Sequence, residues 1–316
     1  MLTNHIYYYL RPLIPRSVQI FLRRQFVIRR RMGGLNNWPI DEKAGERPEG
    51  FTGWPEGKKF AIILTHDIEM AHGHDRCKQL AAIEEEMGFR SSFNFVPKRY
   101  DVSPELRKYL TDKDFEIGVH GLYHDGKLYR SKKIFMERAK EINGFIKEWN
   151  VTGFRSPSMH NNLEWIQALD IEYDASTFDT DPFEPKSEGV ATIFPFRVSS
   201  KDDSKGYIEL PYTLPQDFTL FVMLQEKTID IWKRKLDWVA EKGGMALITT
   251  HPDYMCFDGK KPSVEEYPAE YYREFLEYIK SRYEGQYWQV LPRDLATYWK
   301  SNVNATMPPK HEKRNL

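Results

Sequence analysis

From residue 58 to residue 300, short apolar or alternating stretches take turns with longer amphipathic stretches. The first kind is typical of strands and the second of helices, so the order predicts parallel β/α units. About seven such units fit in this segment, which favours a barrel over an open sheet within the α/β class. The expected strands are 58–67, 91–97, 115–121, 152–158, 170–177 and 245–254, with an extra pair at 194–198 and 207–214. The expected helices are 76–89, 103–113, 131–150, 228–244, 269–283 and 291–301.

Local signals support several of these helices. Ser103 followed by Pro104 is typical of a helix N-terminus, and Gly243 with Gly244 is typical of a C-terminus. A helix is also expected to begin near Asn162. In the helix over 131–150, one stripe collects the apolar side chains that should face the core: Phe135, Ala139, Ile142, Ile146 and Trp149.

The first 57 residues differ from this pattern. Residues 1–40 contain seven Arg and no Asp or Glu, and the segment 17–32 mixes apolar residues with five of these Arg. This predicts a basic amphipathic helix, which either docks on its own domain or a partner chain or lies on an anionic membrane surface. Gly and Pro in 33–57 predict a linker. We therefore divide the chain into an extension (1–57), a barrel (58–301) and a loose polar tail (302–316).

Composition narrows the class of protein. The net charge is zero, so no overall field favours nucleic acid, and no nucleic-acid partner is expected. Cys77 and Cys256 are the two cysteines, too few for a disulfide framework. The N-terminus lacks the uninterrupted apolar core of a secretory signal, and no stretch approaches the ~20 apolar residues of a membrane span. We expect a cytoplasmic protein, peripheral on the inner membrane face if residues 1–32 bind lipid.

Polar, chemically active residues follow the expected strands. The apolar run Ile62–Leu64 gives way to Thr65, His66, Asp67 and Glu69. Other strands end at His120 with His124 four residues later, at Arg155, and at His251. In a parallel barrel all carboxyl ends of strands lie on one face, where active sites are built. A carboxylate after a strand can instead be a helix N-cap, and a lone HxxxH is weak, but together the positions predict one site.

Two imidazoles and one carboxylate are a common ligand set for a catalytic zinc ion, and they also suit iron, cobalt or manganese. A bound divalent metal lowers the pKa of its water molecule towards neutrality. A second carboxylate that does not bind the metal could then act as general base, and a separate His could act as general acid. The residues therefore predict hydrolysis of an amide or an ester.

The ordered motifs resemble the polysaccharide deacetylases, which carry the NodB-like domain of carbohydrate esterase family four. The resemblance covers about residues 58–300, and it implies an incomplete (β/α)7 barrel that removes acetyl groups from sugars with one divalent metal. The motifs that carry it are LTHDIE, SSFNFVP, FEIGVHGLYHDG, GFRSPS, EYDAST and ITTHPDY.

The resemblance also implies roles for individual residues. HDIE resembles the branch in which two carboxylates are separated by one residue, so Asp67 corresponds to the base and Glu69 to the metal ligand, with Asp67 as ligand the alternative. His120 and His124 correspond to the metal-binding pair, and His251 to the general acid. Arg155 would orient the base and pair with Asp174. Candidate substrate contacts are Tyr123, Pro157, Ser158 and Tyr254.

Some positions depart from the family pattern. Ser158 replaces the usual Tyr, although its backbone N–H could still bind an oxyanion. Thr177 stands where a Trp is expected, and Thr249 where a Leu often lines the acetyl pocket. Three histidines lie outside the motifs: we expect His66 to pack beside the site, and His72 and His74 to lie in a loop over its mouth. Trp165 and Phe178 could stack on sugar rings or pack in the core.

The leading interpretation is a metal-dependent deacetylase acting on an N-acetylated sugar of a glycan or glycolipid, with a lipid-linked sugar as one substrate. One alternative is a hydrolase of small non-sugar amides or ureides, which Thr249 and Ser158 leave open. The other is an inactive barrel used as a binding or scaffold domain. A homo-oligomer is compatible with each interpretation.

Overall fold

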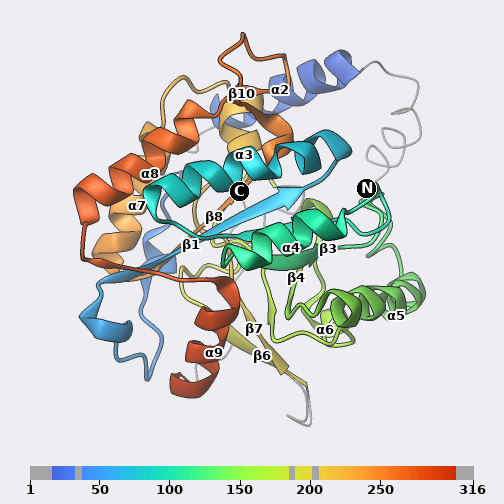
Figure 1. The fold of residues 1–316 in the computed structure, drawn as a ribbon. Helices are drawn as coiled ribbons and strands as arrows, with labels where there is room; N and C mark the ends of the chain where they lie inside the picture. Colours follow the sequence, from blue (N-terminus) through green and yellow to red (C-terminus); the bar gives the residue numbers. More distant parts are fainter. Residues whose placement is uncertain (1–15, 33–37, 185–188, 201–205, 304–316) are drawn as a thin grey trace.

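The first strand, β1 (Phe60–Ile68), lies at the centre of the molecule and is buried along its whole length. This burial explains its nearly continuous apolar run, because a strand in a parallel sheet is covered on both faces. The computed structural model describes residues 16–32, 38–184, 189–200 and 206–303 (Figure 1). Most of the expected polar tail therefore lies outside the described residues, as do residues 1–15.

Seven parallel strands curl around the core in the order β8-β1-β2-β3-β4-β5-β7. They confirm the incomplete (β/α)7 barrel. The two outer strands of this row, β7 and β8, do not pair with each other. Two backbone hydrogen bonds bridge the gap between them: the N–H groups of Thr213 and Leu214 donate to Leu247 O at 3.0 and 3.1 Å. The bounds are β8 (Met245–Thr250), β2 (Ser92–Phe95), β3 (Glu116–His120), β4 (Gly153–Arg155), β5 (Tyr173–Asp174) and β7 (Gly206–Glu209).

Two further strands extend this sheet. β6 (Phe196–Ser199) pairs antiparallel with β7, as expected for the extra pair. β11 (Tyr287–Gln289), which the sequence analysis did not predict, pairs with the first three residues of β1, where β2 does not reach. A separate small ladder joins β9 (Met255–Cys256) to β10 (Tyr267–Pro268).

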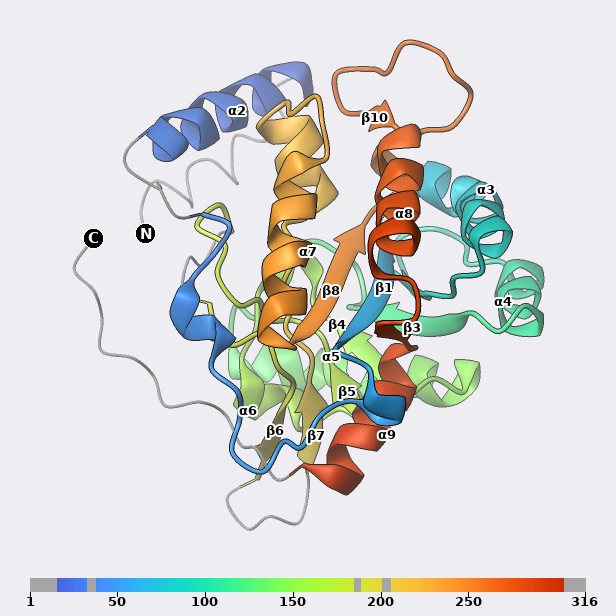
Figure 2. The same cartoon turned by 90° about the vertical axis from the view of Figure 1, so that its left-hand side faces the viewer.

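Helices cover the outside of the barrel (Figures 1 and 2). Ser103 caps α4 by accepting a hydrogen bond from Leu106 N at 3.1 Å, and Gly243 ends α7 with φ +74°, both as predicted. No helix in the described part of the chain is long and apolar enough to cross a membrane. The helices are α3 (Ala71–Met87), α4 (Pro104–Asp112), α5 (Lys132–Trp149), α6 (Leu163–Ile166), α7 (Asp230–Lys242), α8 (Glu270–Tyr283) and α9 (Pro292–Asn302), with short turns η2 (Glu42–Gly45), η3 (Pro55–Gly57), η4 (Pro157–Met159), η6 (Pro252–Tyr254) and the π-helix η5 (Phe218–Met223).

The segment 38–57 packs on the barrel, so its described residues are not the free linker that we expected. Phe51 and Trp54 are buried in the same core as the barrel, and their rings contact Trp299 of α9 at 5.1 and 5.8 Å. Trp54 also donates its indole N–H to Gly243 O at 2.8 Å. Buried Lys235 donates to Pro39 O and to Asp179 Oδ2, both at 2.6 Å. The boundary at residue 58 therefore separates parts of one core.

Candidate metal and acid–base site

The carboxyl ends of the parallel strands bring polar side chains to one rim of the barrel, as the sequence predicted. All of these side chains are buried or nearly so, because the strands deliver them from the core. Their positions on the elements are Asp67 near the end of β1, His120 at the end of β3, Arg155 at the end of β4, Asp174 at the end of β5, and His251 directly after β8.

Three side chains form a compact candidate metal site. Ligand atoms of Glu69, His120 and His124 all lie within 4.8 Å of one another. Nε2 of His124 is 2.9 Å from Oε1 of Glu69. His120 donates from Nδ1 to Arg155 O at 3.2 Å, which leaves its buried Nε2 without a hydrogen-bond partner. A buried, unpartnered ring nitrogen whose other nitrogen is fixed by a carbonyl is the usual arrangement of a metal-binding His.

A strained turn brings the two imidazoles together. His124 has φ +52° and Gly121 has φ +65°, both in the left-handed region that non-glycine residues rarely adopt. A Cβ at position 121 would meet the ring of Pro157 at 2.4 Å, so glycine is required there. The ring centroids of His120 and His124 are 5.1 Å apart. The turn therefore folds the two imidazoles towards each other.

Asp67 lies beside this group and is held in its charged form. Its Oδ1 accepts a hydrogen bond from Asn94 Nδ2 at 2.9 Å and lies 3.6 Å from Arg155 Nε. Burial alone would raise the pKa of Asp67, but the charges of Arg155, His120 and His251, with the Asn94 hydrogen bond, outweigh it and lower the pKa. Oδ2 of Asp67 is 3.9 Å from Nδ1 of His120. The Asp67 carboxylate therefore lies beside the candidate metal site formed by Glu69, His120 and His124.

Arg155 reaches Asp67 but makes no direct contact with Asp174, contrary to expectation. Its guanidinium instead donates to Thr249 Oγ1 and to Thr65 Oγ1, the latter at 3.1 Å. The Thr at position 249 therefore supplies a hydrogen bond that the Leu usual in the family could not. Burial raises the pKa of Asp174 to about 6, and its main neighbour is another buried carboxyl, Glu209. The pKa of Glu209 is raised well above its usual range by burial and by the charge of Asp174, since two adjacent buried carboxylates would repel each other.

His251 is fixed from behind by Asp217, which precedes η5. Asp217 Oδ1 lies 2.7 Å from His251 Nδ1, and its Oδ2 accepts from His251 N at 2.7 Å and from Tyr267 Oη at 2.9 Å. Burial alone would lower the pKa of His251, but the charge and hydrogen bond of Asp217 raise it to about 10. Nε2 is left to face the site as a proton donor.

The loop after β8 holds Glu69, the carboxylate of the candidate metal site. Asp253 accepts hydrogen bonds from Glu69 N at 2.9 Å and from Met70 N at 2.8 Å. Tyr254 donates its hydroxyl to Glu69 Oε2 at 2.8 Å, and its ring centroid lies 5.3 Å from that of His251. The candidate acid and the candidate ligand are therefore positioned by one turn of the chain.

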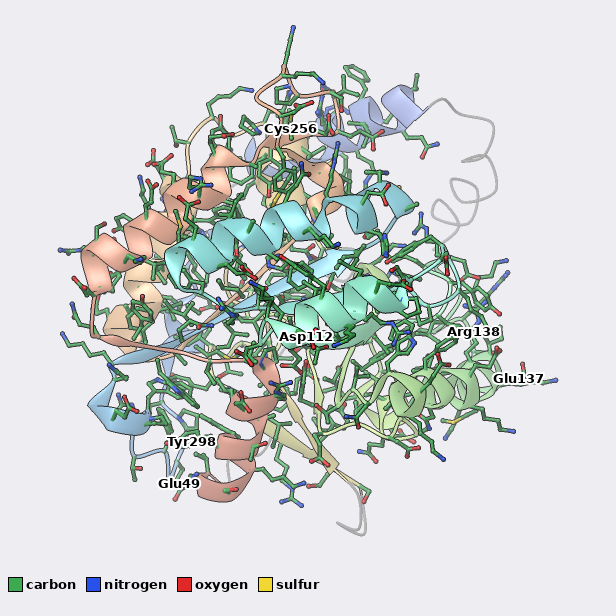
Figure 3. The ribbon with its side chains drawn as sticks, viewed as in Figure 1. Glu49, Asp112, Glu137, Arg138, Cys256 and Tyr298 are labelled. Atoms are coloured by element: carbon green, nitrogen blue, oxygen red, sulfur yellow. The ribbon has the colours of Figure 1, made fainter. Side chains whose placement is uncertain are left out.

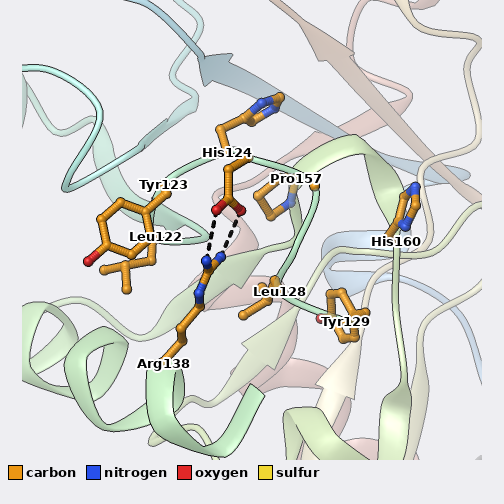
Figure 4. A pocket seen from close by; sticks show the side chains of 10 residues that line it. Leu122, Tyr123, His124, Leu128, Tyr129, Arg138, Pro157 and His160 are labelled. Carbon is orange, nitrogen blue, oxygen red and sulfur yellow. Dashed lines mark hydrogen bonds and ion pairs between the residues drawn. The ribbon is translucent and has the colours of Figure 1, made fainter. Parts of the chain in front are cut away.

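A pocket lies next to His124 (Figure 4). Its lining includes Tyr123, which was expected to contact substrate, together with Pro157 and His160. The Tyr123 ring is partly exposed and lies between two cations, Arg138 at 5.0 Å and Lys98 at 5.7 Å. Ser158 is exposed in η4 with φ +55°. The site therefore opens towards this side of the barrel.

Other candidate residues belong to the core. Phe178 is buried against Tyr212, and Trp165 stacks on Tyr129 with centroids 6.4 Å apart, so neither is placed as a sugar platform. His66 packs beside the site as expected, between Thr250 at 2.7 Å and Glu84 at 2.9 Å.

His72 and His74 do not lie in a loop over the mouth. They occupy the first turn of α3, which begins five residues earlier than predicted. His72 Nε2 lies 3.1 Å from Asp253 O, and His74 Nε2 accepts from Ser103 N at 3.2 Å. Both therefore serve local structure. The carboxylate of Asp253 accepts from the N–H groups of Glu69 and Met70, the two residues that precede the helix, and so fixes the chain where α3 begins.

Four neighbours of the candidate site were not predicted from the sequence: Asn94, Glu209, Asp217 and Asp253. Asn94 and Glu209 lie inside expected strands, and their polarity in such apolar surroundings was an available signal. Asp253 stands within the motif ITTHPDY and could have been weighed with His251. Asp217 had no local signal, because it lies 34 residues before the histidine that it holds.

Comparison with known proteins shows the fold. No family model matches the chain, and no curated protein matches it. A solved structure named as a polysaccharide deacetylase from Mycobacterium smegmatis aligns with a TM-score of 0.64 at 16% identity, over 85% of this chain and 99% of its own. Puue allantoinase aligns with a TM-score of 0.64 at 15% identity, also over 85% and 99%. A polysaccharide deacetylase by name from Pseudomonas aeruginosa PAO1 aligns with 0.62 at 15%, over 84% and 99%.

Proposed function

We propose that this chain, which has the fold of polysaccharide deacetylases, is a metal-dependent member of that family. It would remove the acetyl group from an N-acetylated sugar of a glycan or glycolipid. One observation carries the proposal: ligand atoms of Glu69, His120 and His124 converge within 4.8 Å, Asp67 lies 3.9 Å from His120, and His251 is close enough to interact with Glu69 and Asp67 electrostatically. A carboxylate base, a protonated imidazole and an open ligand set are the groups that hydrolysis of an amide requires.

The donor set fits a divalent cation. Two imidazole nitrogens and a carboxylate suit zinc first, and also iron, cobalt or manganese. The unpartnered Nε2 of His120 and the hydrogen bonds on Glu69 from Tyr254 and on His120 towards Arg155 O match the support that metal ligands need. When bound there, the cation would polarise the acyl carbonyl and acidify a water molecule.

Asp67 is suited to the role of base. Its pKa lies below the ordinary value, so the carboxylate is charged at neutral pH and can accept a proton from the attacking water. Asn94 occupies one lobe of Oδ1 and Arg155 lies near it, which leaves Oδ2 as the accepting atom. Glu69, by contrast, is suited to the role of metal ligand, because its Oε1 lies 2.9 Å from Nε2 of His124, the second candidate ligand.

His251 is suited to the role of acid. Asp217 keeps the imidazole protonated, and the hydrogen bond at Nδ1 leaves the Nε2 proton to be donated to the leaving nitrogen. The backbone N–H of Ser158, exposed in its left-handed turn, supports a further contact to the oxyanion. Tyr123, Pro157 and Tyr254 line the approach and would hold the sugar.

A second candidate is hydrolysis of a small amide or ureide. Thr249 favours this candidate, because it places a hydroxyl next to Arg155 at a position where the family often has an apolar side chain. The likeness to Puue allantoinase shows that the same fold is found in a protein with that name. A screen for acetate against other released carboxylates and ammonia separates the two candidates.

Three preparations test the enzyme claim: wild type with zinc, wild type with chelator, and His120→Ala with zinc. Acetate release from N-acetylated oligosaccharides should fall at least tenfold in the last two. Zinc binding by calorimetry supplies a readout without turnover: His120→Ala should weaken it at least tenfold, whereas Asp67→Asn should keep it and lose activity. Equal binding in all three proteins would refute the ligand set, and a wild type that binds no metal would favour the inactive scaffold.

A further inference from the structure

The helix α2 (Arg16–Met32) docks on the rest of the chain by one side. Ile20 and Val27 are buried there, and Arg24 donates from Nε to Val222 O at 2.7 Å. Arg31 forms an ion pair with Glu226. The amphipathic helix predicted for residues 17–32 therefore exists, and it docks on its own domain.

The other side of α2 carries uncovered apolar side chains. Val18, Phe21, Leu22 and Phe26 are 43%, 57%, 49% and 63% exposed, and we call them the outer α2 face. At about 100° per residue, they lie on the opposite side of the helix from the docked residues. Burying one side does not explain why the helix is apolar on both sides.

The loop between β9 and β10 extends the outer α2 face. Arg24 Nη2 donates to Val264 O at 2.5 Å, and the Val264 side chain is 56% exposed. Together with the outer α2 face, Val264 accounts for all large exposed hydrophobic side chains in the described part of the chain except Tyr123. Exposed apolar side chains that occur singly are scattered over the surface of most proteins. Apolar side chains that gather in one patch instead indicate an interaction surface.

The charges around the patch select its partner. Arg23, Arg29 and Arg31 are exposed on α2, and Lys260 and Lys261 are exposed in the adjacent loop. Residues 1–40 contain no acidic residue, and the acids near the patch each have a basic partner: Glu226 pairs with Arg31, Asp258 with Lys260 and Glu266 with Arg76, and Glu265 interacts with Arg24. An apolar stripe bordered by arginines suits an anionic lipid surface, which accepts the apolar side chains and attracts the cations.

The patch lies at the same end of the molecule as the candidate site. Figure 2 shows α2 and the loop before β10 at the end towards which β1 and β8 point, and Figure 3 places Cys256 of β9 there. Two successive contacts lead from α2 to the candidate site: Arg23 lies over the Phe218 ring at 5.1 Å from its centroid, and the centroid of that ring lies 4.7 Å from that of Tyr254. Tyr254 in turn donates to Glu69.

We propose that the outer α2 face and Val264 bind an anionic membrane surface, which turns the mouth of the barrel towards the lipid headgroups. The chain would then be peripheral on the inner membrane face. The substrate would be an acylated sugar linked to a lipid, a step that rests on the proposed function.

Vesicle sedimentation tests the binding without any need for turnover. Full-length protein should sediment with vesicles of phosphatidylcholine and phosphatidylglycerol in a seven-to-three ratio, and stay in solution with phosphatidylcholine alone. Phe21→Gln with Phe26→Gln should lower the partition coefficient at least tenfold, and Arg23→Gln with Arg29→Gln about tenfold. The matched control removes two exposed cations from α5, Lys133→Gln with Lys140→Gln, and should bind as wild type does.

Two results would overturn the proposal: wild type that does not sediment with anionic vesicles, and a double Phe variant that still does. Light scattering identifies the rival occupant, since a dimer abolished by the Phe changes without vesicle binding would make this face an interface between copies. Hydrolysis of one acylated sugar, free or coupled to a lipid in vesicles, separates this proposal from the proposed function. The Phe variant should lose the vesicle rate at least tenfold and keep the rate on the free sugar.

Discussion

Replacing Asp217 with Asn should release His251 from its protonated state. Asp217 makes the only charged contact to the His251 ring among the described residues, with Oδ1 at 2.7 Å from Nδ1. Burial would by itself lower the pKa of this imidazole, and Asp217, with smaller contributions from Glu69 and Asp67, raises it to about 10. Asn keeps the shape of the side chain but removes the charge, so burial should then dominate and the pKa should fall.

The size of the effect follows from the two pKa values. Without the carboxylate, the pKa of His251 should return to about 6.5 or lower. At pH 8 a group with that pKa is about 3% protonated, so a step that needs the imidazolium should slow about 30-fold. At pH 6 most of the difference should disappear. The sign is fixed: loss of Asp217 removes activity on the alkaline side and leaves the acidic side nearly unchanged.

The titration itself can be measured without substrate. The NMR signal of the His251 ring in metal-free protein should show no transition up to pH 8 in wild type, and a transition near or below pH 6.5 in Asp217→Asn. Tyr267→Phe is the control, because it removes a hydrogen bond to Asp217 Oδ2 but leaves the charge. Circular dichroism checks folding, because the side-chain amide of Asn carries N–H donors where the donors of His251 and Tyr267 now meet a carboxylate. An unchanged His251 transition in Asp217→Asn would refute the electrostatic reasoning.

Three further predictions concern stability and are measured by urea unfolding. Burial raises the pKa of Glu116 to about 7. The stability that protonated Glu116 contributes to the folded state is therefore complete below about pH 4.5 and is lost as the pH rises through about 7. Glu116→Gln should therefore be up to about 3 kcal/mol more stable than wild type at pH 8 and nearly equal at pH 4.5; equal stability at both would contradict this. Gly73→Ala would place a Cβ 2.4 Å from the Asp253 carboxylate and should cost about 1–3 kcal/mol. Gly144→Ala, with no atom within 4 Å of its added Cβ, should gain about 0.5–1 kcal/mol, and similar signs for the two would refute the packing argument. Lys235→Met leaves a buried carboxylate unpaired and should cost about 3–5 kcal/mol; a loss below 1 kcal/mol would show that the ion pair is not stabilising.

The sequence predicted the barrel and the convergence of Glu69, His120 and His124 because both follow from local patterns. Each strand is an apolar run that ends at a polar residue, and parallel strands bring these ends together. That single rule was enough to group His120 with Glu69, which are 51 residues apart in the chain. The extra strand pair was also predicted, although its place beside β5 was not.

Other features could not be predicted because their causes are distant in sequence. The partner of His251 was missed, since nothing around Asp217 distinguishes it from a surface acid until η5 folds back on β8. The start of α3 was placed too late because the residue that fixes the chain just before it, Asp253, comes from another loop. Arg155 was paired with Asp174 by resemblance, but Thr249 offers a closer acceptor in this chain.

The packing of residues 38–57 determines where this chain can be shortened. A fragment beginning at residue 58 would keep all seven parallel strands yet lose Phe51 and Trp54, leaving the Trp299 ring bare to solvent. It would also strip one of the two acceptors from the ammonium of Lys235. Such a truncation is expected to aggregate, so a recombinant domain or a fusion junction belongs upstream of Trp38.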